Sequence, residues 1–319
     1  MRTVITGADG FIGRALAAEL TGAGREVVAC TMGAAPLHPL PAGVTQFVSG
    51  PITGETYWGR ALRKDDVVVH LAARVHVMRE TAADPLADFR VVNTAGTVNL
   101  ARQAAAAGVK RFVFMSTVGV NGNNSGADPY KETDPPLPHN DYSVSKWEAE
   151  EELVKIAGTS SMQVVVVRAP LVYGPGNPGN FASLLRLVSA GLPLPFASVR
   201  NVKSFIYVQN LVSALSLCCT HPAAAGLYLV SDSEFVSTPE LVRKLGSYMG
   251  HPVRLFPFPA KLLTAAGRAV GKRAAAESLL ASLAVDSAKI RKQLGWRPPV
   301  SMDDGLRRTV EWFSARSKV

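Results

Sequence analysis

The N-terminal order of a short apolar segment, a glycine-rich loop and a helix-like segment constrains the fold more than any other feature. Residues 2–6 read as a buried strand, and the segment from Arg14 to Leu20 reads as a helix. Between them lies Gly7-Ala8-Asp9-Gly10-Phe11-Ile12-Gly13. In such a loop the first glycine permits a tight turn, the second lets a pyrophosphate approach the backbone, and the third lets helix and strand pack closely. The pattern predicts a dinucleotide site at the helix N-terminus.

Apolar segments alternate with helix-like segments beyond this loop. Strands are expected at residues 26–30, 45–48, 67–71, 111–115, 163–167, 204–208 and 227–231. Helices are expected at residues 55–62, 93–107, 142–152, 181–190 and 209–220. The alternation predicts an α/β fold with a doubly wound parallel Rossmann sheet, in which ligands bind at the carboxyl ends of the strands.

A segment rich in proline and glycine, from Arg168 to Gly179, marks where the chain leaves this sheet. It is expected to be irregular, whereas the apolar helix at 209–220 is expected to return to the sheet. The predicted division is 1–170 plus about 204–230 for a dinucleotide-binding domain, and 171–203 plus 231–319 for a smaller C-terminal substrate-binding domain.

Composition narrows the class of protein. The chain has 319 residues, of which 47% are hydrophobic, but no run approaches the roughly 20 apolar residues that cross a bilayer. The cysteines, Cys30, Cys218 and Cys219, lack metal-ligand spacing and are expected to be core residues. The net charge of +9 is spread along the chain without a nucleic-acid motif, so it indicates a basic surface suited to an anionic substrate. We expect a cytoplasmic protein with no transmembrane segment, no metal and no nucleic-acid partner.

Tyr142 and Lys146 form the clearest candidate for an acid–base pair. If residues 142–152 are helical, the two side chains lie one turn apart on one face. A nearby ammonium favours the phenolate, so Lys146 would lower the pKa of Tyr142 and let it exchange a proton near neutral pH. A surface helix that carries an aromatic residue and a charge is the plain alternative.

Ser116 and Thr117 end the expected strand at 111–115, at the edge of the sheet where ligands bind. A Ser-Thr pair there also fits simple turn capping. A loop of about twenty residues, Asn121 to Asn140, follows and is rich in glycine, asparagine, aspartate and proline. Such a long connection usually has a function, so it is expected to cover the site.

Five motifs follow one another in the order typical of one family. They are the glycine loop, His70-Leu71-Ala72-Ala73, Ser116-Thr117, Tyr142-xxx-Lys146, and Arg168 to Gly176. With these motifs the chain resembles the extended short-chain dehydrogenase/reductases, the NAD-dependent epimerase/dehydratase family, over essentially its full length. Residues 287–298 also look like the C-terminal signature of that family.

The resemblance implies a role for each matching residue. Tyr142 would donate or accept the proton, Lys146 would lower the pKa of Tyr142 and hold the nicotinamide ribose, and Thr117 would hydrogen-bond the reacting oxygen. The implied cofactor contacts are Gly7, Gly10, Phe11, Ile12, Gly13, Thr31, Leu71, Ala72, Ala73, Ser116, Tyr142, Lys146 and Val172. The implied substrate contacts are Thr117, Asn180, Phe196 and Lys203. The family often has arginine in place of Lys203, and lysine lacks the bidentate geometry of arginine.

The second strand leaves the choice between NAD and NADP open. An acid at its end would bind the ribose hydroxyls of NAD, and a basic residue would accommodate the 2′-phosphate of NADP. Neither charge is present, because the strand ends in Thr31-Met32-Gly33.

The resemblance implies a UDP-sugar substrate and a homodimer. Dehydratases of the family carry an Asp-Glu pair after the active-site threonine or serine, whereas Val118-Gly119 follows Thr117, so dehydration is disfavoured. Residues 71–78, 179–181 and 204–208 look most like bacterial 4-ketoreductases of polysaccharide assembly. Those enzymes reduce UDP-2-acetamido-2,6-dideoxy-hexos-4-ulose to UDP-N-acetylquinovosamine or its 4-epimer. A UDP-sugar 4-epimerase with tightly bound NAD is the alternative, and a non-catalytic dinucleotide-binding sensor or scaffold is a second one.

Overall fold

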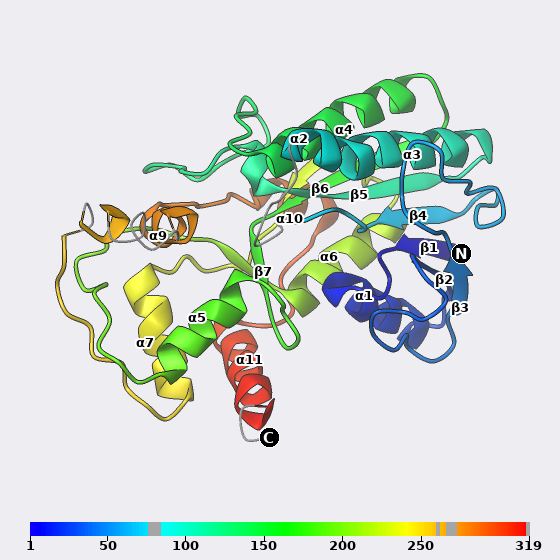
Figure 1. Cartoon of the computed structure of the whole chain (residues 1–319). Coiled ribbons are helices and arrows are strands. Elements are labelled where there is room, and N and C mark those ends of the chain that lie inside the picture. The colour runs from blue at the N-terminus through cyan, green and yellow to red at the C-terminus, as the bar shows by residue number, and fades with distance from the viewer. Residues whose placement is uncertain (76–83, 260–261, 266–272, 317–319) are drawn as a thin grey trace.

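The computed structural model describes residues 1–75, 84–259, 262–265 and 273–316 (Figure 1). Within these residues, seven strands form one sheet in which every neighbouring pair is parallel. In their spatial order the strands are β3 (Thr45–Val48), β2 (Glu26–Thr31), β1 (Arg2–Thr6), β4 (Val67–His70), β5 (Arg111–Thr117), β6 (Gln163–Ala169) and β9 (Gly226–Leu229). The predicted doubly wound Rossmann sheet is confirmed. Its strand order reverses between β1 and β4, where ligands bind in open α/β sheets.

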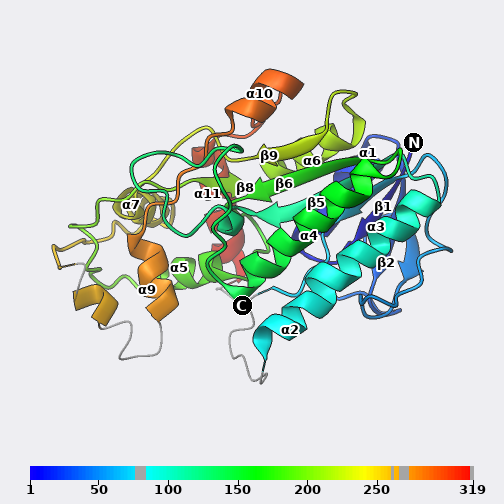
Figure 2. The same cartoon turned by 90° about the horizontal axis from the view of Figure 1, so that it is seen from above.

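Helices cover both faces of the sheet (Figures 1 and 2). One face carries α1 (Phe11–Gly22) and α6 (Val208–Thr220), so the apolar helix at 209–220 does return to the sheet. The other face carries α3 (Thr97–Ala106) and α4 (Asp141–Gly158). Each face has its own cluster of buried apolar side chains, because the strands are apolar on both sides. Cys30, Cys218 and Cys219 are buried and free, as expected.

The prediction of a helix at residues 55–62 is wrong, because this segment forms turns. Its conformation is set by tertiary contacts that override the local helical pattern. The Trp58 side chain is fully buried, and Asn99 and Gln103 of α3 donate hydrogen bonds to the Thr56 carbonyl oxygen at 2.7 and 2.8 Å. Backbone groups that a helix would have paired are thus satisfied by side chains.

The helix expected at 93–107 begins earlier than predicted. It opens with α2 (Pro85–Phe89), continues through the π-helical segment Arg90–Gly96, and leads into α3. The Asp84 side chain caps the start by accepting from the Ala87 amide at 3.1 Å, and Pro85 occupies the first turn. A proline after an aspartate is a helix-start signal that the apolar periodicity alone did not reveal.

The C-terminal part lies beside the carboxyl end of the sheet. It holds α5 (Asn180–Ser189), α7 (Thr238–Tyr248), α9 (Arg273–Leu280), α10 (Ala288–Leu294) and α11 (Met302–Arg316). A second small sheet pairs β7 (Leu171–Tyr173) with β8 (Phe205–Tyr207), so part of the segment expected to be irregular is a strand.

One buried apolar cluster runs through the sheet layer and the C-terminal part, and includes Ile5, Leu16, Leu241 and Leu306. The two parts therefore share a core, and the division into two domains stays a prediction. Among the described residues, no helix has the length and apolar character to span a bilayer.

Candidate active site

The glycine loop has the shape that its sequence predicts. Gly7 has a φ of +64°, and a Cβ there would lie 2.9 Å from the Ala72 amide nitrogen. A Cβ on Gly13 would lie 2.1 Å from the Gly7 carbonyl oxygen. Gly10 is the N-cap of α1 and leaves the first turn without a side-chain cap, so amide groups of the helix start stay available for an anion. The loop, with Phe11 and Ile12 partly exposed, fits the pyrophosphate of a dinucleotide.

The backbone of Leu71 and Ala72 lies beside this loop, and Ala73 follows them in the chain. Thr6 pairs with His70 in register across β1 and β4, which brings the two strand ends together. The Thr6 hydroxyl oxygen accepts hydrogen bonds from the Leu71 and Ala72 amides, both at 3.2 Å.

The segment that follows Val172 brings this residue near the start of α1, beside the glycine loop. Its carbonyl oxygen accepts a hydrogen bond from the Asn177 side chain at 2.6 Å, and Gly176 lies near Phe11 and Arg14 of α1.

Two predicted cofactor contacts have side chains that are engaged elsewhere. Thr31 is buried, and its hydroxyl group donates to the Gly33 carbonyl oxygen at 2.9 Å and accepts from Gln46. Ser116 is also buried and donates to Glu150. Contacts of either residue with a cofactor would therefore come from its backbone.

The helix with the tyrosine and lysine begins as the sequence indicates. Asn140 and Ser143 form a reciprocal capping box that fixes the start of α4. The Tyr142 ring is partly exposed and meets the Phe89 ring edge-on, with 6.1 Å between the centroids. One turn later the Lys146 side chain is 1% exposed, and its Nζ lies 3.9 Å from the centroid of the Phe114 ring.

The expected lowering of the pKa of Tyr142 by Lys146 is not found. Burial raises the pKa of Tyr142 to about 12. Burial also lowers the pKa of Lys146 to about 7, against an opposing effect of the Glu150 carboxylate. The ammonium lies over the Phe114 ring, where a cation–π contact stabilises it. At neutral pH the tyrosine therefore carries its proton and the lysine sits near its own titration point.

Thr117 lies next to the start of the tyrosine helix. Its hydroxyl oxygen accepts from the Gly119 amide at 3.1 Å, which is the turn capping that the sequence analysis weighed. This bond uses a lone pair and leaves the hydroxyl proton free for another acceptor. A Cβ on Gly119 would lie 3.3 Å from both Thr117 Oγ1 and Ser143 Cβ, so strand end and helix start are in close proximity.

The long loop at 121–140 packs against the C-terminal part. The Ser125 and Tyr130 amides donate to the carbonyl oxygens of Ser282 and Ala284 at 3.0 and 2.9 Å. The loop thus joins the sheet to the segment before α10.

The predicted substrate contacts other than Thr117 differ in their burial and in their place in the fold. Phe196 is buried in the apolar core. Asn180 is the first residue of α5. Lys203 is partly buried, and burial lowers its pKa to about 8. Among the described residues, no carboxylate forms an ion pair with Lys203. Residues 76–78, on which part of the subfamily similarity rests, lie outside the described ranges.

Two side chains outside the predicted cofactor and substrate contacts hold the site together. His70 is fully buried between Thr6 and Thr97. Asn93 accepts from the Arg74 amide at 2.8 Å and donates to Ser145 on the tyrosine helix at 3.0 Å. Histidine at a strand end and Asn93 at the expected helix start were visible in the sequence, but their partners come from distant segments.

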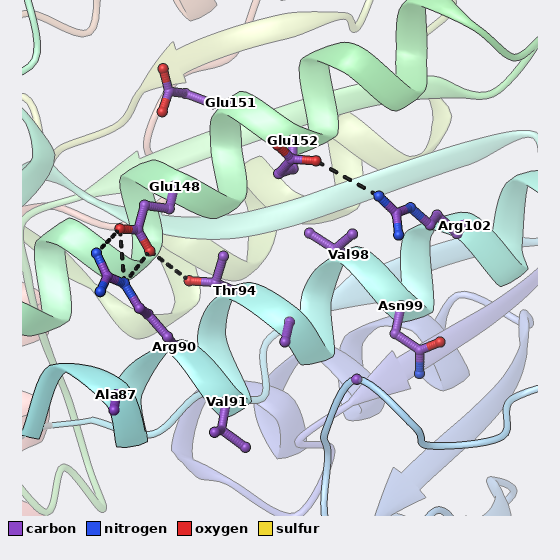
Figure 3. A pocket seen from close by; sticks show the side chains of 12 residues that line it. Ala87, Arg90, Val91, Thr94, Val98, Asn99, Arg102, Glu148, Glu151 and Glu152 are labelled. Atoms are coloured by element: carbon purple, nitrogen blue, oxygen red, sulfur yellow. Dashed lines mark hydrogen bonds and ion pairs between the residues drawn. The ribbon is translucent and has the colours of Figure 1, made fainter. Parts of the chain in front are cut away.

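A groove of about 770 Å³ lies away from these residues, on the outer side of α2, α3 and α4 (Figure 3). Val91, Ala95 and Val98 line it together with the ion pairs Arg90–Glu148 and Arg102–Glu152. None of the predicted site residues lines this groove.

The chain is similar to known proteins in sequence and in fold. A described relative, the UDP-glucose 4-epimerase of Vibrio cholerae, is 42% identical over 315 residues, which cover 97% of this chain and 94% of the relative. The solved UDP-glucose 4-epimerase of Thermus thermophilus, in complex with NAD, is 28% identical with a TM-score of 0.78, covering 98% of this chain and 99% of that one. The Thermotoga maritima UDP-glucose 4-epimerase with UDP-glucose shares the fold at 22% identity, with a TM-score of 0.79 and coverage of 99% and 100%.

The family profile that matches residues 3–230 starts in β1, includes the glycine loop and the tyrosine helix, and ends just after β9. The match includes every strand of the main sheet. The chain belongs to the NAD dependent epimerase/dehydratase family, the extended short-chain dehydrogenase/reductases.

Proposed function

We propose that the protein is a UDP-sugar 4-epimerase that keeps NAD bound through turnover. The observation that carries this proposal is the 42% identity, over nearly the full length of both chains, with the UDP-glucose 4-epimerase of Vibrio cholerae. The site geometry supports it, because a glycine loop shaped for a pyrophosphate lies at the same sheet edge as Tyr142, Lys146 and Thr117.

The glycine loop would hold NAD, and its nicotinamide would supply reversible hydride transfer at carbon 4 of the sugar, which can invert that carbon. In its phenolate form Tyr142 would remove the proton of the 4-hydroxyl group and later give it back, while the Thr117 hydroxyl group donates a hydrogen bond that orients the oxygen. Because burial raises the pKa of Tyr142 to about 12, it needs a nearby cation when it transfers the proton. Lys146, one turn along the helix, is the candidate for that cation.

Net 4-keto reduction, the reaction that the sequence analysis put first, has less support than epimerisation from the relatives. Dehydration stays disfavoured, because Val118 and Gly119 follow Thr117 where dehydratases have carboxylates. A non-catalytic sensor or scaffold is also disfavoured, since the similar proteins reported above are enzymes.

NAD is the proposed cofactor because nothing at the end of β2 would bind a 2′-phosphate. Thr31, Met32 and Gly33 are uncharged, and the related Thermus thermophilus enzyme was solved with NAD. Lys203 is the proposed contact for the UDP diphosphate. A partly buried lysine whose pKa is lowered to about 8 gains from an anionic partner.

The test separates epimerisation from reduction. Purified protein is incubated with UDP-glucose and, separately, with UDP-N-acetylglucosamine, and the products are resolved by chromatography. We expect the 4-epimer to form with no change in absorbance at the wavelength of reduced nicotinamide. The parallel reaction holds a UDP-4-keto-6-deoxy-HexNAc with NADH or NADPH. Stoichiometric loss of reduced nicotinamide there, with no epimer formed from either UDP-sugar, would replace the proposal with a ketoreductase.

We also propose that two copies of the chain associate through the groove on α2, α3 and α4. Apolar Val91 and Ala95 are exposed there, and the ion-paired Arg90 and Glu148 line the same groove (Figure 3). A surface with both signs of charge around an apolar strip can pair with itself across a two-fold axis.

A further inference from the structure

A buried acidic side chain lies one turn beyond Lys146. Tyr142, Lys146 and Glu150 follow each other at intervals of four residues, which places them along one side of α4. Glu150 is 4% exposed and Lys146 is 1% exposed. A carboxylate is expensive to bury unless other groups pair with it, so its partners indicate why it is there.

Glu150 has partners from two neighbouring strands. Arg168 of β6 donates from Nη2 to Oε2 at 2.6 Å and from Nε to Oε1 at 3.0 Å, which is bidentate pairing. The Ser116 hydroxyl group of β5 donates to the same carboxylate. Arg168 also donates to Asn121, at the start of the long loop, at 2.9 Å.

These contacts join the elements that carry the proposed chemistry. Ser116 and Arg168 are partners in the register of β5 and β6, and Thr117 is the next residue after Ser116. The carboxylate therefore connects the strand end that carries Thr117 to the helix that carries Tyr142 and Lys146.

Among the described residues, Glu150 is the one acidic side chain whose charge acts on Lys146. His70 of β4 lies on one side and is neutral, because burial lowers its pKa to about 3. Phe114 of β5 presents its ring face to the ammonium. On the helix itself, Tyr142 carries its proton at neutral pH and Glu150 carries the negative charge that favours protonated Lys146. Two buried cations, Lys146 and Arg168, thus depend on one carboxylate.

We infer that Glu150 is a positioning residue of the proposed active site. Its carboxylate holds the Thr117 strand end against the Tyr142 helix, and its negative charge stabilises the Lys146 ammonium where the nicotinamide ribose would bind. The inference rests on the proposed function for the identity of the reaction, but its test uses cofactor binding and needs no sugar turnover.

The test compares Glu150→Gln with Glu311→Gln, at an exposed glutamate on α11 that does not line the groove. NAD affinity is measured by equilibrium dialysis between pH 6 and pH 9. Wild type and Glu311→Gln should both bind more weakly as the pH rises through about 7, where Lys146 loses its proton. In Glu150→Gln the weakening of NAD binding should begin at lower pH. We expect the NAD affinity of this variant to be about threefold to tenfold below wild type at pH 8 and nearly equal to wild type at pH 6.

The pH profile separates this role from a structural one. A loosened site would weaken NAD binding by the same factor at every pH, and that parallel shift would overturn the inference. If Glu150→Gln does not fold because Arg168 is left unpaired, the double variant Glu150→Gln/Arg168→Met removes both buried charges. The double variant should show the same move to lower pH, and a wild-type profile would also overturn the inference. Wild type that binds NAD but interconverts no UDP-sugar would refute the proposed function and leave this test intact.

Discussion

The Thr6 hydroxyl group donates a hydrogen bond to Nδ1 of His70 across the point where the sheet reverses its strand order, with 2.7 Å between the two atoms. The direction of this bond follows from the neighbours. Thr6 Oγ1 already accepts from two amides, and Thr97 accepts from the other ring nitrogen while it donates to the Asn93 carbonyl oxygen at 2.7 Å. His70 is therefore neutral with its proton on Nε2, and it locks the strand end beside the glycine loop.

Acid should destabilise the protein through His70. Burial lowers the pKa of His70 from the ordinary 6.5 to about 3, so between these values the unfolded chain binds a proton that the folded chain does not. The stability that the neutral ring contributes is complete above pH 6.5 and is lost as the pH falls toward 3, by about 1.4 kcal/mol for each pH unit. Urea unfolding at pH 7 and pH 5 measures this loss.

The control for this prediction is a pair of variants. His70→Asn is expected to be less stable at pH 7 and to lose about 2 kcal/mol less than wild type between pH 7 and pH 5. Exposed His251→Asn should keep the wild-type difference. Equal pH dependence in His70→Asn and wild type would contradict the assignment.

The glycine loop gives a prediction with a matched control in one helix. Gly13→Ala places a methyl group 2.1 Å from the Gly7 carbonyl oxygen, so the loop must move. We expect NAD binding to be lost or weakened by at least about 100-fold, since the loop backbone forms the proposed pyrophosphate site. Gly22→Ala, at the other end of α1, meets no atom within 4 Å and should stabilise the protein by about 0.5–1 kcal/mol without changing NAD affinity. Isothermal titration and thermal melting measure both effects, and NAD bound normally by Gly13→Ala would contradict the site.

The sequence predicted the sheet and the glycine loop because their signals are local. Apolar strands, Gly7 with its positive φ, and the start of α4 at Asn140 are each encoded within a few residues. The segment 55–62 was predicted wrongly because Asn99 and Gln103, about forty residues away, hold its backbone. Long-range partners of this kind leave no trace in local periodicity.

The electrostatics of the site were harder to predict than its residues. The spacing of Tyr142 and Lys146 indicated proximity along a helix. It could not show that the Lys146 ammonium lies over the Phe114 ring, or that burial is the main cause of both pKa shifts. Glu150 was visible four residues after Lys146, yet its pairing with Arg168 depends on the register of β5 and β6.

Removal of the Tyr142 phenolic oxygen should slow turnover strongly while it preserves the fold. Tyr142→Phe keeps the ring contact with Phe89 and loses the proton carrier, so we expect epimerisation to slow by about 100-fold to 10,000-fold. The melting temperature and the amount of bound NAD should stay close to wild type. Tyr57→Phe, at a ring that is 69% exposed, is the control and should be fully active. A Tyr142→Phe variant with more than about a tenth of wild-type turnover would remove Tyr142 from the proposed mechanism.

A charge placed in the groove on α2, α3 and α4 should separate the proposed dimer. Val91 is 47% exposed and lines the groove that also holds Glu148, so Val91→Glu adds a carboxylate to an apolar strip that two copies would bury against each other. Buried like charges weaken such contacts, and we expect the dimer dissociation constant in sedimentation velocity to rise by at least about tenfold. Val48→Glu is the matched control, because Val48 is also 47% exposed but lies on the edge strand β3. If wild type sediments as a monomer at micromolar concentration, or if both variants dimerise equally, this groove does not join two copies.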